Sequence, residues 1–176
     1  SDWSSDVCSS DLGTAHPGRW NMACDEWLLD TALQNGQPTV RIYAWSRPTV
    51  SLGYFQQPDA LESNPLVAGL DQVRRLSGGG AIVHHHEWTY SCVVPAGDPN
   101  TARGPDLYDV VHQSIIDELV TLANGPIAGL GLRETVDGSD EPALCFARPA
   151  AEDVVCGKHK VLGSAQRRRR PADRRF

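Results

Sequence analysis

The most regular apolar pattern in the chain has helical spacing and occupies residues 106–123, DLYDVVHQSIIDELVTLA. Apolar side chains recur there every three or four residues, so a helix would gather them on one face. The members of this apolar face are Leu107, Val110, Val111, Ile115, Leu119 and Leu122. Asp106 directly precedes them and is a favourable N-cap residue. The pattern therefore predicts an amphipathic helix that begins near Asp106.

Structure is expected to begin near residues 18–33, GRWNMACDEWLLDTAL, and a second helix is predicted within this stretch. Its apolar positions, again at helical spacing, are Met22, Leu28, Leu29, Ala32 and Leu33. Asn21 is expected to cap the helix, and Asp25 and Glu26 would then lie in its first turn, where the helix dipole favours acidic side chains. Gly36, followed closely by a proline, is expected to end it.

Alternation with a period of two predicts a β-strand at residues 39–45, TVRIYAW. Such a strand has one face made of Val40, Ile42 and Ala44, and an opposite face made of Arg41, Tyr43 and Trp45. Pro48 interrupts the pattern, and residues 49–55, TVSLGYF, are predicted to form the partner strand.

The remaining β-rich segments are short and bounded by glycine, proline or polar residues. Strands are predicted at residues 72–76, 81–86 and 88–94, and residues 152–166 are predicted to form a hairpin. Helices and strands are interspersed without a regular βαβ rhythm. The pattern favours an α+β fold in which a mixed or antiparallel sheet is flanked by helices.

Length, charge and cysteine content narrow the class of protein. A chain of 176 residues can bury one substantial core. The net charge of −6 argues against a nucleic-acid partner, and no apolar run reaches membrane-spanning length, so no membrane partner is expected. Five cysteines without short paired spacing, and no signal-peptide pattern, indicate free thiols and a cytoplasmic location. The Ser/Asp-rich residues 1–12 are expected to be a disordered or non-native lead.

The segment RRLSGGGAIVHHHEWTYS, residues 74–91, admits three interpretations: a loop that cradles a ligand, a metal site, or a tight turn with nothing bound. Adjacent glycines can expose backbone N–H groups to an anion, but taken alone they favour an ordinary turn. On a strand, His84 and His86 would point to one side and His85 to the other, so the three cannot ligate one ion. No metal is therefore predicted, and one inward histidine that orients a loop or ligand is favoured.

Three ordered blocks resemble the lipoate/biotin protein ligase and octanoyltransferase superfamily. RRLSGGGAIVHH is similar to the family's RRxTGGGAxxHD segment, NMACDEWLL to its NMAxDExLL helix, and KVLGSAQRR to its segment with a functional lysine. The resemblance implies a lipoate/biotin ligase-like catalytic domain over residues 13–170. It also implies a C-terminal truncation, because the family pattern does not continue into residues 171–176. One departure is His85, where the family usually has aspartate.

Within that superfamily, the pair Cys145-Phe146 resembles the branch of cysteine-dependent octanoyltransferases, octanoyl-[acyl-carrier-protein]:protein N-octanoyltransferases. The resemblance implies that Cys145 carries the acyl group and that Lys160 assists it. The partners would be octanoyl-acyl-carrier protein and a lipoyl domain or the glycine-cleavage H protein, with no cofactor. The residues implied in substrate binding are Arg75, Ser77, Gly78, Gly79, Gly80, Ala81, His84, Gly163, Ser164 and Ala165.

Two other functions and several structural interpretations remain open. An ATP-dependent lipoate–protein ligase would share the glycine block and the lysine, and an inactive fragment could bind an acyl group or a carrier without turnover. Cys145 could simply fill apolar space, as Cys24 and Cys92 are expected to do, and Cys156 is a rival nucleophile. Lys160 could be a solvated hairpin charge.

Overall fold

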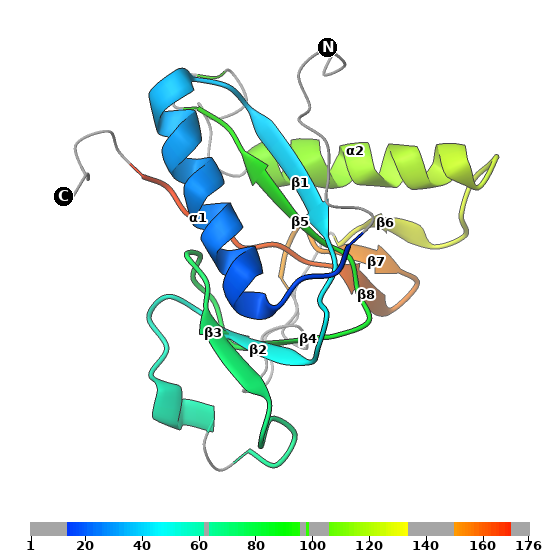
Figure 1. Ribbon diagram of the computed structural model, residues 1–176. Coiled ribbons are helices and arrows are strands. Elements are labelled where there is room, and N and C mark those ends of the chain that lie inside the picture. The colour runs from blue at the N-terminus through cyan, green and yellow to red at the C-terminus, as the bar shows by residue number, and fades with distance from the viewer. Residues whose placement is uncertain (1–13, 62–63, 96–97, 99–105, 134–149, 170–176) are drawn as a thin grey trace. The chain divides into compact units, whose positions relative to one another are not determined.

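The chain folds into two compact units, each of which combines one long helix with short strands (Figure 1). The first unit comprises Ser1–Asp98 together with Gln166–Phe176, and the second comprises Pro99–Ala165. The computed structural model describes residues 14–61, 64–95, 98, 106–133 and 150–169. The α+β class predicted from the sequence is confirmed. The predicted lead at residues 1–12 and tail at residues 171–176 lie outside the described residues.

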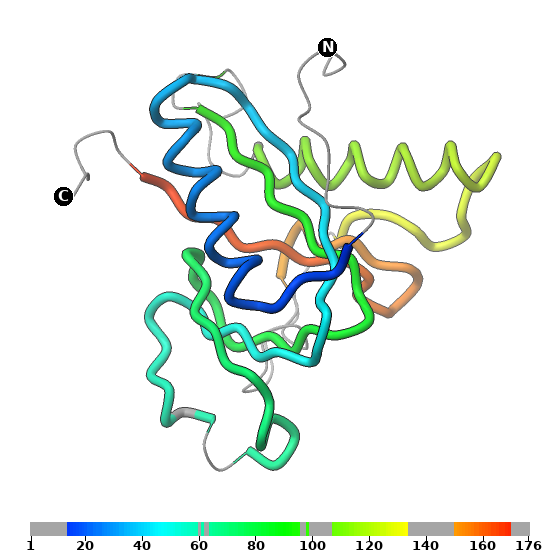
Figure 2. Tube along the Cα trace, in the orientation of Figure 1, coloured from blue at the N-terminus to red at the C-terminus, as the bar shows by residue number. Residues whose placement is uncertain are grey.

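In the first unit, helix α1 (Gly18–Asn35) packs against strands β1 (Thr39–Tyr43), β3 (Asp71–Arg74) and β5 (Thr89–Val93). β1 and β5 pair antiparallel, with Ile42 opposite Tyr90. The tube in Figure 2 shows α1 running beside this pair of strands.

A three-stranded sheet in the same unit has β2 (Thr49–Leu52) at its centre. β2 pairs in parallel with β3 and antiparallel with β4 (Ile82–His84), and a short 3-10 helix, η1 (Pro58–Leu61), lies on the connection from β2 to β3. Every residue of β2 is buried, as its central place requires. The prediction that residues 49–55 partner residues 39–45 is therefore wrong, because β1 takes its partner from a strand far along the chain.

The predicted alternation in β1 is confirmed, and its polar and aromatic face is the buried one. Arg41, Tyr43 and Trp45 are buried, whereas Ile42 is exposed. This orientation is stable because the guanidinium of Arg41 has acceptors on α1 and lies 3.9 Å from the centroid of the Tyr43 ring.

Helix α1 begins earlier than its polar residues suggest. Pro17 is the N-cap residue, so the prediction that Asn21 caps the helix, with Asp25 and Glu26 in its first turn, is wrong. Asn21 lies inside the helix, fully buried, and its side-chain amide donates to the carbonyl oxygen of Ala44 at 3.2 Å. The C-terminal end of α1 is as predicted. Gly36 has a φ of 70°, and its N–H donates to a carbonyl oxygen of the last turn.

In the second unit, helix α2 (Asp106–Leu122) packs on β6 (Leu130–Leu132). Strands β6, β7 (Val154–Cys156) and β8 (His159–Leu162) form an antiparallel sheet in that order. The helix predicted from Asp106 and the predicted hairpin are both confirmed. The β7–β8 pairing has an irregularity between Val154 and Val155, directly after the residues that carry the polar contacts described below.

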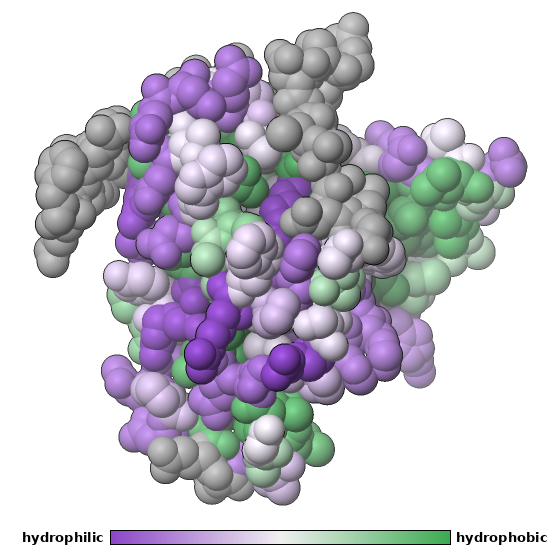
Figure 3. Space-filling view, in the orientation of Figure 1, coloured by the Kyte–Doolittle hydropathy of each residue, from purple (hydrophilic) through white to green (hydrophobic). Residues whose placement is uncertain are grey.

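The exposed surface of the first unit is uneven in polarity. Figure 3 shows hydrophilic residues along α1 and apolar ones gathered at the end of the unit that carries η1. Phe55 and Leu66 are among the exposed apolar side chains. Within the described ranges, no helix combines the length and the hydrophobicity needed to cross a bilayer.

Candidate active site

Arg75 holds the glycine-rich segment closed. Its guanidinium donates from Nη2 to the carbonyl oxygens of Gly78 at 2.7 Å and Gly80 at 2.6 Å, and from Nη1 to the carbonyl and hydroxyl oxygens of Ser51. A buried cation that satisfies several backbone oxygens fixes the loop to β2. The role of Arg75 in substrate binding stays a prediction; the structure places it beneath the loop.

The glycine-rich loop also approaches Gly53, directly after β2, so closely that residue 53 must be glycine. A side chain at Gly53 would bring its Cβ to 1.9 Å from the carbonyl oxygen of Gly79. The N–H of Tyr54 donates to the carbonyl oxygen of Ser77 at 2.9 Å, which ties the segment after β2 to the loop. Gly79 has a φ of 89°, so glycine is required there for backbone reasons.

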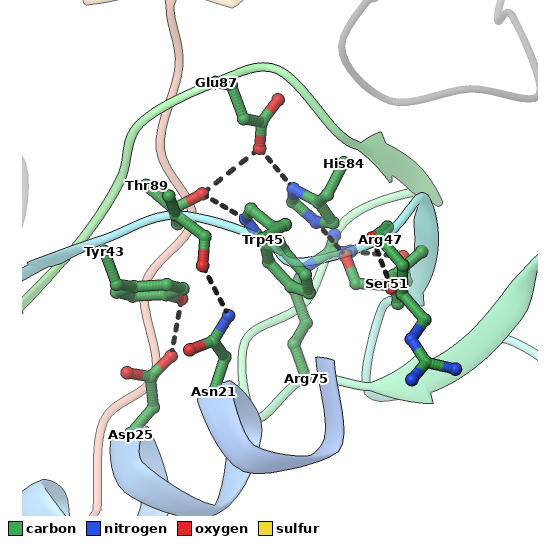
Figure 4. A network of polar contacts seen from close by, with 12 residues as sticks. Asn21, Asp25, Tyr43, Trp45, Arg47, Ser51, Arg75, His84, Glu87 and Thr89 are labelled. Carbon is green, nitrogen blue, oxygen red and sulfur yellow. Dashed lines mark hydrogen bonds and ion pairs between the residues drawn. The ribbon is translucent and has the colours of Figure 1, made fainter. Parts of the chain in front are cut away.

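His84 is the inward histidine that the sequence predicts (Figure 4). Its Nδ1 contacts the carboxylate of Glu87, its Nε2 lies 2.7 Å from Oγ of Ser51, and its ring stacks on Trp45 with centroids 4.0 Å apart. Because carboxylate oxygens only accept, Nδ1 carries a hydrogen. Ser51, His84 and Glu87 thus resemble a nucleophilic triad, but Ser51 is 0% exposed and cannot meet a substrate. The trio is connected to the loop through Ser51, whose hydroxyl oxygen accepts a hydrogen bond from Arg75.

The other two histidines lie outside β4, which ends at His84, so the expected alternation does not extend to His86. His85 and His86 are exposed, with ring centroids 3.6 Å apart. Among the residues that the structure describes, no group of three or more histidine, cysteine or acidic side chains is gathered as a metal site would require.

A second buried polar cluster joins α1 to β1 and β5 (Figure 4). Asp25 accepts hydrogen bonds from Arg41 at 3.0 Å, Tyr43 at 2.9 Å and Ser91 at 2.5 Å. Burial nevertheless raises the pKa of Asp25, because it penalises the charged carboxylate more than these donors favour it. The cluster is a structural anchor for the helix.

Lys160, the predicted catalytic lysine, lies on β8 in the second unit and is mostly buried. Its Nζ is 2.9 Å from Oδ1 of Asp153, whose side chain is 3% exposed. Oδ2 of Asp153 accepts the N–H of Ala150 at 2.8 Å and faces Nε of Arg133 at 3.9 Å. The ammonium is therefore held in one place rather than solvated.

Gly163 leaves the space in which the end of Lys160 lies. A Cβ at Gly163 would approach Cε of Lys160 to 2.3 Å, its Nζ to 2.6 Å, and Oδ1 of Asp153 to 3.1 Å. The glycine of the GSA sequence thus has a steric reason: it lets the ammonium fold back onto the carboxylate. Ser164 and Ala165, the next two residues, are exposed.

Sequence patterns did not identify His112, which lies on α2 and is 1% exposed. Its Nδ1 contacts the carbonyl oxygen of Glu152, and its Nε2 lies 2.6 Å from Oγ of Ser164. Burial lowers the pKa of His112, so the imidazole is neutral. The only available signal was a polar residue within an apolar helical segment, which says nothing of its partners.

Cys145, the predicted nucleophile, lies outside the described residues. In the described part of the chain, none of Cys24, Cys92 and Cys156 forms a disulfide. Burial raises the pKa of Cys92 to about 11, which suits the predicted role as an apolar filler rather than a nucleophile. Cys156 lies at the end of β7, with Sγ 3.6 Å from the carbonyl oxygen of Ala128.

The structure divides the predicted site residues between the two units. The members in the first unit belong to the glycine-rich loop, its flanks and strand β4: Arg75, Ser77, Gly78, Gly79, Gly80, Ala81 and His84. Lys160, Gly163, Ser164 and Ala165 belong to the second, where Asp153 and His112 join them. Ala81 is fully buried, so its side chain packs beneath the loop.

Comparison with known proteins connects these residues to a family. The family model for the lipoyl protein ligase A/B catalytic domain matches residues 17–172. Octanoyltransferase LipM of Carboxydothermus hydrogenoformans is 40% identical over 161 residues, which are 86% of this chain and 56% of the relative. Octanoyltransferase LipM of Moorella thermoacetica is 37% identical over 168 residues, which are 90% of this chain and 59% of the relative. The chain therefore spans about three fifths of the length of these relatives.

A solved T. acidophilum structure, described as a lipoate protein ligase with bound lipoic acid, has the same fold. It superposes with a TM-score of 0.62 over 93% of this chain and 61% of that chain, at 22% identity. The likeness at this identity concerns the fold alone.

Proposed function

This chain belongs to the lipoyl protein ligase A/B catalytic-domain family, and from that premise we propose that it acts as an octanoyltransferase. Octanoyl passes from acyl-carrier protein to a thioester on Cys145, and then to a lysine of a lipoyl domain or of the glycine-cleavage H protein. No cofactor is required, because the acyl group arrives already activated as a thioester.

Two observations support this proposal. Relatives named octanoyltransferases align with most of the chain at 40% and 37% identity. The observation that carries the proposal is the contact of Lys160 Nζ with Asp153 Oδ1 at 2.9 Å, with the Lys160 side chain only 14% exposed. A fixed ammonium can hydrogen-bond the oxygen of an acyl group, whereas a solvated hairpin charge would have to be ordered first.

The chemistry proceeds in two acyl transfers. In the first, the Cys145 thiolate attacks the carrier thioester and the carrier thiolate leaves. In the second, the neutral amine of the acceptor lysine attacks the Cys145 thioester, the C–S bond breaks, and the amine loses a proton as the amide forms. Lys160 would stabilise the negative oxygen that develops in each step. The second step is downhill because an amide is more stable than a thioester.

Intact-mass spectrometry tests the proposal directly. Incubation with octanoyl-acyl-carrier protein, without ATP, should add one octanoyl group to the protein. Cys145→Ser should abolish the adduct, and Cys156→Ser should retain it, since Cys156 is the nearest rival in the sequence. An adduct that survives in Cys145→Ser would remove Cys145 from this role.

The same assay separates the other functions. A lipoate–protein ligase would modify a lipoyl domain only with ATP and free octanoate or lipoate. Carrier binding with neither an adduct nor an ATP-dependent product would identify a binding protein without turnover. Either result would overturn the octanoyltransferase proposal.

A further inference from the structure

The hydrogen bonds of His112 fix which ring nitrogen carries its hydrogen. The carbonyl oxygen of Glu152 can only accept, so Nδ1–H donates to it. In the neutral imidazole, Nε2 then bears the lone pair and accepts the hydroxyl hydrogen of Ser164 across 2.6 Å. A buried base is thereby linked to Ser164, which is an exposed residue.

We propose that His112, through Ser164, accepts the proton that the ammonium of the acceptor lysine must lose before its amine attacks the octanoyl thioester. This inference rests on the proposed function and supplies the base that amide formation requires. A lysine amine has an ordinary pKa of about 10.4, so at neutral pH almost all of it is ammonium and cannot attack. A positioned base is therefore worth a large rate factor in this step.

The position of the pair supports this role. Ser164 follows Gly163, whose missing side chain makes room for the end of Lys160. Glu152, which accepts from His112, precedes Asp153, which holds the Lys160 ammonium. Two adjacent residues directly before β7 and two directly after β8 thus contact the base and the predicted catalytic lysine.

The backbone at Glu152 is unusual in a way that fits a functional site. Its φ is 65°, a left-handed conformation that glutamate rarely adopts. Such strain persists where surrounding contacts impose it, and here the Glu152 carbonyl must turn toward Nδ1 of His112. The strained residue therefore selects the imidazole form whose Nε2 can take a proton.

Burial keeps His112 neutral near pH 7, because it lowers the pKa more than the surrounding charges raise it. The opposing groups are Asp109 on α2 and Glu152 and Asp153 before β7. Tyr108 also lies near, with its ring centroid 6.1 Å from that of His112. The nearby acidic groups would stabilise the imidazolium once a proton arrives.

The proton transfer balances without another reactant. The ammonium gives one proton to Oγ of Ser164, which gives its own to Nε2 of His112, and the resulting amine attacks the thioester carbonyl. The C–S bond breaks and the amide nitrogen sheds its second proton to solvent. The imidazolium then gives its proton to solvent and the departing thiolate takes one from solvent, so one proton is released per amide formed.

A single-turnover pH profile with His112→Gln tests the role. The glutamine carboxamide keeps one donor and one acceptor, so it can preserve both hydrogen bonds, but it cannot take a proton near neutrality. The enzyme is first octanoylated, freed of carrier, and mixed with a lipoyl domain from about pH 5.5 to about pH 9, a range that brackets the ordinary histidine pKa. Intact mass then follows transfer of the octanoyl group.

The two proteins should differ in the shape of the profile. The wild-type rate should level off above the pKa of His112, because it depends on neutral imidazole and ammonium together. The His112→Gln rate should rise about tenfold per pH unit, because only free amine reacts, and near neutrality it should be roughly a hundredfold lower. An unchanged rate and profile in His112→Gln would show that the pair is only structural, and would overturn the inference.

Ser164 provides a second test that does not depend on a buried substitution. Ser164→Ala should slow transfer as His112→Gln does, and Ser164→Thr should restore it, because threonine keeps the hydroxyl. Equal rates in the alanine and threonine variants would contradict the relay. If wild-type protein forms no adduct, the proposed function fails together with the inference; if the adduct forms and transfer is unaffected, only the inference fails.

Discussion

At the scale of single residues, substitution of Gly163 should lower activity without lowering stability. Gly163→Ala would place a methyl group 2.6 Å from Nζ of Lys160, which must then leave Asp153. The end of a lysine is flexible, so the free energy of unfolding should change little. We expect the rate of octanoyl adduct formation to fall by at least about tenfold, the effect of losing an interaction worth about 1.4 kcal/mol in the transition state.

Gly131→Ala is the matched control for that substitution. Gly131 lies on β6 in the same unit, and a Cβ there meets no atom within 4 Å. Its adduct rate should equal that of the wild-type protein. A similar loss in both variants would mean that the second unit tolerates no added methyl group, and that the Lys160 contact is not the cause.

At the scale of elements, the glycine-rich loop depends on its close approach to the end of β2. Gly53→Ala would place a Cβ 1.9 Å from the carbonyl oxygen of Gly79, and neither backbone can yield easily. The loop should separate from the strand and weaken the hydrogen bonds that Arg75 donates to Gly78 and Gly80. We expect a lower denaturation midpoint, with a loss of roughly 1–3 kcal/mol typical of overpacking.

Gly78→Ala tests whether that loss is specific. Gly78 belongs to the same loop, but a Cβ there meets nothing within 4 Å. Its denaturation midpoint should stay within the small range of neutral surface substitutions. Midpoints that fall equally in Gly53→Ala and Gly78→Ala would show that any side chain in the loop is harmful.

The elements themselves were largely predictable, because their signals are local. The position of α2, the β7–β8 hairpin and Gly36 at the end of α1 follow from spacing and from backbone preference. The predicted apolar face of α2 is only partly right, because Leu119 and Leu122 are exposed while Ile116 is buried. Pairing was not predictable in the same way: β1 and β2 are neighbours in sequence, yet β1 pairs with β5. Asn21 was misassigned as a cap because its partner, the carbonyl of Ala44, is brought near only by the fold.

The candidate site also has some features that the sequence predicts and others that only the fold creates. Family motifs pointed to Lys160 and to the glycine-rich loop, and they gave no reason for either. Asp153 and His112 have no motif, because their importance comes from contacts with Lys160 and Ser164 that tertiary structure creates. The chemistry of the site therefore stays a prediction from the family motifs, whereas the contacts of Lys160 and Ser164 could be found only in the structure.

At the scale of the whole molecule, the two units can be observed separately. All five tryptophans precede residue 99 and so belong to the first unit. Tryptophan fluorescence therefore follows the first unit, whereas circular dichroism includes α2 of the second. The buried histidine of the second unit makes a stability measurement by circular dichroism informative about the site.

Stability should fall as the pH drops below the ordinary histidine value. The unfolded chain has His112 near its ordinary pKa of about 6.5, and burial lowers the pKa in the folded state, so between the two values the unfolded chain binds more protons. The full stability is present above about pH 6.5 and is lost as the pH falls toward the folded value. The urea midpoint, followed by circular dichroism, should therefore drop more on acidification in wild-type protein than in His112→Gln. Equal drops would mean that His112 does not titrate differently in the two states, and that the neutral imidazole required of the base is not set by burial.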